Sequence, residues 1–148
     1  MNEIARILLV DDDPRDVELT IEALSENRLA NEVVVVNDGE EALEYLFRNG
    51  RHADRAPGNP AVTFLDLKLP KISGIEVLRR IRGDGALRTL PVVILTSSRE
   101  ERDLVEGYRT GANAYVVKPV EFTAFINAVR ELGLFWAIMN EPPPYNRA

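Results

Sequence analysis

Five short, continuous apolar runs, separated by longer amphipathic segments, constrain this chain more than any other feature of its sequence. Continuous apolar runs of four to five residues are typical of strands that are buried on both faces of a parallel sheet. The sequence therefore predicts five strands that are all buried in this way. They are residues 7–10, 33–36, 61–65, 92–95 and 114–117.

The segments between these runs carry apolar residues at helical spacing, as at Val17, Ile21 and Leu24. Pro14 and Gly39 lie where helices can begin, and Gly111 lies where a helix can end. Five strands that alternate with five helices predict an α/β fold, a doubly wound five-stranded parallel sheet with helices on both faces. Periodicity does not give the strand order. With 148 residues, of which 45% are hydrophobic, the chain can bury one core.

Polar side chains gather at the carboxyl ends of the predicted strands, which is the edge where parallel α/β sheets bind ligands. Asp11 and Asp12 follow the first strand, Asp66 the third, Thr96 the fourth and Lys118 the fifth. Each of them alone has an ordinary explanation, such as a helix cap or a solvated surface charge. Together they offer a carboxylate nucleophile, oxygen ligands for a metal, and donors for phosphoryl oxygens. The combination favours phosphoryl chemistry.

Carboxylates that crowd together need a cation or a proton to offset their repulsion. Oxygen ligands without histidine or cysteine suit a hard divalent ion, so Mg²⁺ is the predicted cofactor, with Mn²⁺ or Ca²⁺ as substitutes. The chain has no cysteine, which excludes thiolate metal sites and disulfides. Asp13, directly before Pro14, fits better as a helix-terminal acid than as a ligand.

Net charge and hydropathy bear on the expected partners. The formal net charge is -6, so a phosphate backbone would repel this surface, and we expect no nucleic-acid binding. No apolar stretch reaches the roughly 18 residues that a membrane helix needs, so we expect no membrane partner and a cytoplasmic protein. Residues 48–60 form a polar connection without apolar periodicity. His52, the single histidine, is expected to be solvated there.

Four stretches of the chain resemble the receiver domains of two-component response regulators. The matching residues are 7–12, 64–70 together with Gly74, 93–97 and 111–119. The resemblance implies a flavodoxin-like fold with strand order 2-1-3-4-5, and a receiver domain that covers residues 1–132. It also implies a phosphoacceptor that signals through an altered protein surface.

The resemblance implies a role for each residue around the acceptor. Asp66 would accept the phosphoryl group from a phosphohistidine of a partner histidine kinase. Asp12, Asp66 and the backbone carbonyl of Lys68 would hold the metal directly, while Asp11 would act mainly through a bound water. The side chains of Lys68 and Ser98 would tune the lifetime of the phosphate.

Further roles concern the response to phosphorylation. Lys118 and Thr96 would contact the phosphoryl oxygens, and Tyr115 would turn inward as a switch when Thr96 moves. The alternative for Tyr115 is a half-buried core aromatic. The peptide bond between Lys118 and Pro119 would be cis, which costs little before proline.

Two rival functions are open at this point. A phosphatase of the haloacid-dehalogenase type also uses a strand-end Asp, but it needs a second Asp two residues later, where Lys68 stands. A pseudo-receiver would bind partners without ever carrying phosphate, and the complete set of acidic, hydroxyl and ammonium groups argues against it. We therefore expect no enzyme activity beyond Mg²⁺-dependent self-phosphorylation and slow hydrolysis of the protein's own aspartyl phosphate.

Residues 133–148 form an extension beyond a minimal receiver, with an apolar run at 134–139 followed by prolines. An exposed run of this kind must pack on its own domain or form a subunit interface. The extension and the long loop resemble single-domain response regulators that partner phytochrome-type (bacteriophytochrome) histidine kinases, in which such a segment contributes to homodimers. The interface candidates are Leu134, Phe135, Trp136, Ile138, Met139 and Asn140.

Overall fold

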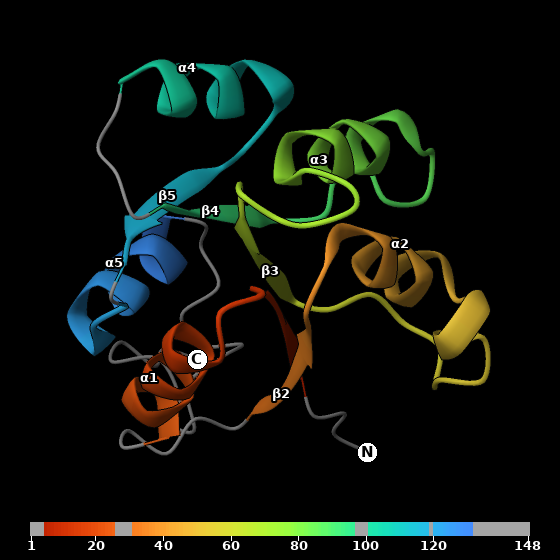
Figure 1. Ribbon diagram of the computed structural model, residues 1–148, viewed down its shortest axis with the longest axis horizontal. Helices are drawn as coiled ribbons and strands as arrows, with labels where there is room; N and C mark the ends of the chain where they lie inside the picture. Colours follow the sequence, from red (N-terminus) through yellow and green to blue (C-terminus); the bar gives the residue numbers. More distant parts are fainter. Residues whose placement is uncertain (1–4, 26–30, 97–100, 119, 132–148) are drawn as a thin grey trace, which may run out of the picture.

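The computed structural model describes residues 5–25, 31–96, 101–118 and 120–131, which form a five-stranded sheet flanked by helices (Figure 1). Every strand pair is parallel, and the strand order is β2-β1-β3-β4-β5, so the predicted fold and order are confirmed. The strands are β1 (Ala5–Val10), β2 (Asn31–Val36), β3 (Val62–Asp66), β4 (Val92–Thr96) and β5 (Ala114–Val117). The helices are α1 (Pro14–Ser25), α2 (Gly39–Phe47), the 3-10 turn η1 (Gly50–His52), α3 (Gly74–Gly83), α4 (Glu101–Thr110) and α5 (Phe122–Glu131).

Two hydrophobic cores lie on opposite faces of the sheet. One joins β1, β3 and β4 to α1 and α5, and includes the stacked rings of Phe64 and Phe125, whose centroids are 5.2 Å apart. The other joins the opposite faces of the same strands to α2 and α3. α4 lies on this second side, where Gly107 leaves room for Ile94 of β4. The two layers explain why the strands carry continuous apolar runs.

Burial differs between the middle and the edges of the sheet. Every residue of β3 and β4 is buried, and so are residues 7–10 of β1. At the edges, residues 33–35 of β2 are only half-buried, and Tyr115 of β5 is 42% exposed. The prediction that all five strands are buried on both faces is therefore wrong for the edge strands, because the helices cover the middle of the sheet more fully than its margins.

The predicted helix boundaries are confirmed where a cap or glycine marked them. α1 begins at Pro14, directly after Asp13, and α2 begins at Gly39, after the cap Asp38. Gly111 follows α4 with a φ of 117°, a left-handed conformation that glycine adopts without strain. Among the described residues, no helix is both long and apolar enough to span a membrane.

The connection between α2 and β3 is fixed by side chains rather than by an apolar face. Arg6 of β1 donates to the carbonyls of Pro57 and Gly58, both at 2.9 Å. The guanidinium of Arg55 lies over the ring of Tyr45, 4.1 Å from its centroid. The part of the connection around Pro57 and Gly58 therefore lies against the amino-terminal end of β1.

His52 belongs to this ordered connection. Its Nε2 lies 2.9 Å from a carboxylate oxygen of Glu41, and its ring packs edge-on against Tyr45. The expectation of a solvated histidine is wrong, because helix α2 supplies both a polar and an aromatic partner within reach.

Candidate functional site

The carboxyl ends of four strands bring the predicted site residues to one edge of the sheet. Asp11 directly follows β1, Asp66 ends β3, Thr96 ends β4 and Lys118 directly follows β5. Asp11 and Asp66 are buried, which acidic residues seldom are unless they are paired, and Thr96 is buried as well. These residues thus lie at the same edge of the sheet, as the parallel strands predicted.

Three of the carboxylates form a tight cluster. Asp11, Asp12 and Asp66 each offer one oxygen, and these oxygens all lie within 4.8 Å of one another. Asp11 and Asp66 are buried, while Asp12 is exposed, so the cluster opens to solvent on one side. A cluster of oxygen donors alone fits a hard divalent cation such as Mg²⁺, Mn²⁺ or Ca²⁺.

Local backbone contacts orient the two buried carboxylates. Asp11 Oδ1 accepts a hydrogen bond from the backbone N–H of Asp13 at 3.0 Å, and Asp66 Oδ1 accepts one from Lys68 at 3.0 Å. Gly74, at the start of α3, packs against the backbone of Asp66 and Leu67 so closely that a Cβ would overlap the Asp66 carbonyl oxygen. The loop after β3 therefore needs glycine at this position to keep its path.

Lys118 contacts carboxylates from three separate segments of the chain. Its Nζ donates to Asp66 Oδ2 at 2.8 Å, to Asp16 Oδ2 at 2.9 Å and to Asp11 Oδ2 at 3.3 Å. The Lys118 side chain is only 8% exposed, and its backbone N–H donates to the Thr96 carbonyl at 2.7 Å. The ammonium is therefore a fixed component of the site.

The electrostatics of the site reflect this crowding. Burial raises the pKa of Asp11, and the nearby charge of Asp66 adds to the rise, although the Asp13 N–H and Lys118 partly oppose it. Burial alone would lower the pKa of Lys118. Hydrogen bonds to Asp16 and Asp66, with the charges of Asp66 and Asp11, outweigh burial and raise that pKa. Lys118 is thus held in its charged form at neutral pH.

Asp16 is the site residue that the sequence reasoning missed. That reasoning considered residues at strand ends, whereas Asp16 lies in the first turn of α1. The spacing held a signal: Asp16 follows Asp12 by four residues, directly inside a helix that begins at Pro14. A carboxylate in the first turn of a helix that starts beside the site can reach that site.

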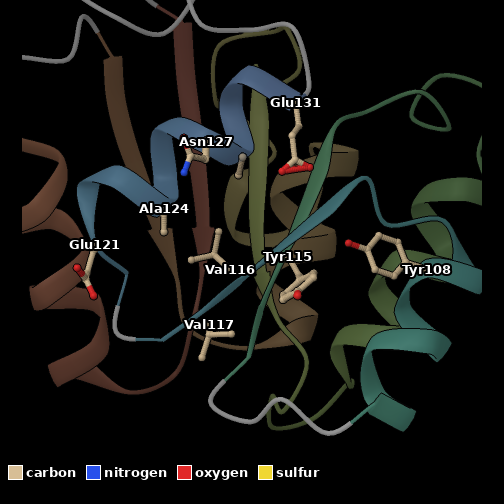
Figure 2. Close-up of a pocket in the computed structure, with 9 residues that line it drawn as sticks. Tyr108, Tyr115, Val116, Val117, Glu121, Ala124, Asn127 and Glu131 are labelled. Carbon is tan, nitrogen blue, oxygen red and sulfur yellow. The ribbon is translucent and has the colours of Figure 1, made fainter.

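The other predicted residues are placed as follows. Tyr115 points away from the core and packs edge-on against Tyr108 of α4, with ring centroids 6.1 Å apart (Figure 2). Together with residues of α5, these tyrosines line a groove on the surface of α4, β5 and α5. The half-buried core aromatic is therefore not what the structure has at Tyr115. Ser98, Pro119 and the six interface candidates lie outside the described residues.

Known proteins match this chain over most of its length. Residues 7–130 match the family model of the response regulator receiver domain. The solved bacteriophytochrome response regulators RtBRR and AtBRR are both 58% identical, with TM-scores of 0.85 and 0.87. The RtBRR comparison covers 96% of this chain and 86% of that one, and the AtBRR comparison covers 95% and 100%.

A third relative is the response regulator Rcp1 of Synechocystis sp. (strain ATCC 27184 / PCC 6803 / Kazusa). It is 34% identical over 130 residues, which are 88% of this chain and 87% of Rcp1. The solved Mn²⁺-bound form of Rcp1 has a TM-score of 0.74 at 32% identity and covers 94% of this chain and 99% of that one. On its fold, its strand-end cluster and these relatives, the chain belongs to the response regulator receiver domain family, whose members are phosphoacceptors in two-component signalling.

Proposed function

We propose that Asp66 is the phosphoacceptor of this receiver. The observation that carries the proposal is a buried carboxylate with the Lys118 ammonium at 2.8 Å and two further carboxylates beside it. In the reaction, an oxygen of Asp66 forms a bond to the phosphorus of a phosphohistidine. The bond from phosphorus to the histidine nitrogen breaks, and its electron pair leaves with the imidazole.

The divalent metal would be held by Asp12, Asp66 and the backbone carbonyl of Lys68, with Asp11 acting mainly through water. The oxygen-only cluster supports this assignment, as does the Mn²⁺-bound form of Rcp1. Mg²⁺ is the ion we expect, and when bound it neutralises charge on the phosphoryl oxygens. Lys118 and Thr96 supply the remaining contacts to those oxygens, while the side chains of Lys68 and Ser98 tune the phosphate's lifetime.

The expected partner is a histidine kinase of the phytochrome type. Support comes from the 58% identity to RtBRR and AtBRR, which are both bacteriophytochrome response regulators. After phosphorylation, Thr96 moves toward the phosphoryl group and Tyr115 turns inward into the space that it leaves. The exposed ring of Tyr115 supports this switch, because an inward turn would change the surface of α4, β5 and α5.

Phosphorylation by acetyl phosphate and Mg²⁺, followed by intact-mass analysis, tests the acceptor. We expect one added phosphoryl group on the natural protein, none on Asp66→Asn, and none when EDTA removes the metal. Glu22→Gln is the matched control, because Glu22 is an exposed acid on α1, outside the acidic cluster. A natural protein that stays unlabelled would favour the pseudo-receiver, and a labelled Asp66→Asn would refute the acceptor assignment.

A further inference from the structure

We propose that Asp16 is a positioning residue for phosphoryl transfer, whose carboxylate holds the Lys118 ammonium over Asp66. The proposal rests on the proposed acceptor role of Asp66. It assigns to Asp16 neither metal binding nor contact with the phosphoryl group.

The Lys118 ammonium donates hydrogen bonds to Asp16 as well as to the acceptor. Lys118 Nζ has three protons, and three carboxylates lie within hydrogen-bonding distance of it. The contact with Asp16, at 2.9 Å, is nearly as short as that with Asp66 and shorter than that with Asp11. Asp16 is therefore the stronger of the two anchors that Lys118 has besides the acceptor itself.

Both ends of this ion pair are attached to fixed backbone. Asp13 Oδ1 accepts from the N–H of Arg15 at 2.9 Å, which caps the helix turn that carries Asp16. The hydroxyl of Thr20 donates to the Asp16 carbonyl at 2.8 Å. On the other side, the Lys118 N–H is bonded to the end of β4. Two fixed backbones, 102 residues apart in sequence, thus define where the ammonium lies.

The place of Asp16 separates it from the metal cluster. The carboxylates that lie within 4.8 Å of one another are Asp11, Asp12 and Asp66. Asp16 contacts Lys118 from the helix side, and its side chain is 26% exposed. It can therefore keep its contact when a metal occupies the cluster and when Asp66 is phosphorylated.

Phosphorylation of Asp66 explains what the contact between Asp16 and Lys118 contributes. When Asp66 becomes an acyl phosphate, the carboxylate that Lys118 contacts at 2.8 Å is replaced by phosphoryl oxygens. A lysine side chain has four flexible carbons, so an ammonium without a second anchor would lose rotational freedom in the transition state. Asp16 holds the ammonium in advance, so that this entropic cost is not part of the barrier.

Two substitutions separate positioning from charge. Asp16→Ala removes the hydrogen-bond acceptor, and we expect the rate of phosphorylation by acetyl phosphate to fall roughly tenfold. Asp16→Asn keeps the shape of the side chain and one acceptor oxygen but removes the charge. We expect the phosphorylation rate of this variant to stay within about threefold of the natural rate. Glu22→Gln, on the same helix, controls for the loss of one negative charge from α1.

A spectroscopic measurement reports on Lys118 without phosphorylation or metal. The Nζ resonance of Lys118 is identified by its loss in Lys118→Met, and its proton exchange with water is then measured by ¹⁵N NMR. We expect exchange to become roughly tenfold faster in Asp16→Ala and to change little in Glu22→Gln. A substitution that merely loosened the fold would speed exchange at backbone amides as well, and those serve as the internal reference.

Several outcomes overturn the proposal. They are an unchanged phosphorylation rate in Asp16→Ala, an unchanged Lys118 exchange rate in that variant, or an Asp16→Asn variant as slow as Asp16→Ala. These failures leave the acceptor assignment standing if Asp66→Asn is still unlabelled. If the natural protein and Asp66→Asn label alike, the proposed function fails instead, whatever Asp16 does to the ammonium.

Discussion

Asp11 carries a buried carboxylate, and its burial raises the pKa of the group. A raised pKa means that the folded state prefers the protonated form more than the unfolded state does. Below the ordinary value of 3.8, Asp11 is protonated in both states and does not affect stability. Above the raised value it is ionised in both, and the folded state bears the whole cost of the buried charge.

Replacing Asp11 by Asn should therefore stabilise the metal-free protein at neutral pH. The variant's gain in free energy of unfolding over the natural protein should be absent below pH 3.8. It should grow between pH 3.8 and the raised pKa of Asp11, and stay constant at higher pH. Urea unfolding in EDTA across this pH range measures it. Mg²⁺ should raise the melting temperature of the natural protein more than that of the variant. An Asp11→Asn variant that is less stable at pH 7 in EDTA would contradict this account.

At this scale the sequence predicted which side chains gather at the strand ends, because parallel strands leave little choice. The sequence did not predict the environment of Lys118, because a lysine before a proline is usually a solvated surface residue. Three carboxylates from separate segments of the chain surround that ammonium, and such convergence appears only once the helices are placed. Asp16 was missed for the same reason.

Among the elements, α3 is tied by Arg82 to the segments that precede β4 and β5. Its guanidinium donates to the carbonyl of Leu90 at 2.7 Å, to that of Gly111 at 2.8 Å and to Asn113 Oδ1 at 2.9 Å. Asn113 Oδ1 also accepts the N–H of Val92, the first residue of β4. One side chain thus joins α3 to the segments that enter β4 and β5.

Arg82→Met should lower the free energy of unfolding by about 2 kcal/mol, because two part-buried carbonyls and the exposed Asn113 Oδ1 lose a charged donor. Arg79→Met is the matched control on the same helix, since Arg79 forms an exposed ion pair with Glu76 at 2.9 Å and should matter little. Urea denaturation of both variants measures the difference. Equal stabilities of the two variants would show that Arg82 does not tie these elements together.

Element positions were predictable because the alternation of apolar runs with helical periodicity fixes an α/β arrangement. The failures lie at the margins of the sheet. Tyr115 is in a run that predicts full burial, yet within the described residues strand β5 lies at the edge of the sheet, beside β4. The polar connection at 48–60 owes its order to Arg6 and Arg55, and long-range side-chain contacts of this kind leave no periodic signal.

At the scale of the whole molecule, the feature of interest is the number of copies of the chain in the signalling unit. We propose a homodimer formed through the apolar run at 134–139, since Trp, Phe and Met are favoured interface anchors. This segment, like the proposed domain boundary at Leu132, lies outside the described residues. The order of strands in the receiver itself followed from the family resemblance, and periodicity alone could not have supplied it.

Truncation after Leu132 should convert a dimer into a monomer while the receiver remains folded. Sedimentation velocity at several concentrations, with circular dichroism as a check on folding, measures both properties. A truncated protein that remains dimeric would place the interface elsewhere, and intact protein that sediments as a monomer would exclude the dimer altogether.

The central claim is that phosphate is carried by the side chain of Asp66. Borohydride reduces an acyl phosphate of aspartate to homoserine, so reduction after phosphorylation marks the acceptor permanently, and peptide mass spectrometry then locates it. We predict homoserine at residue 66 in the natural protein and in Glu22→Gln. Homoserine at Asp11, Asp12 or Asp16, or its absence from a protein that has gained a phosphoryl group, would contradict the account.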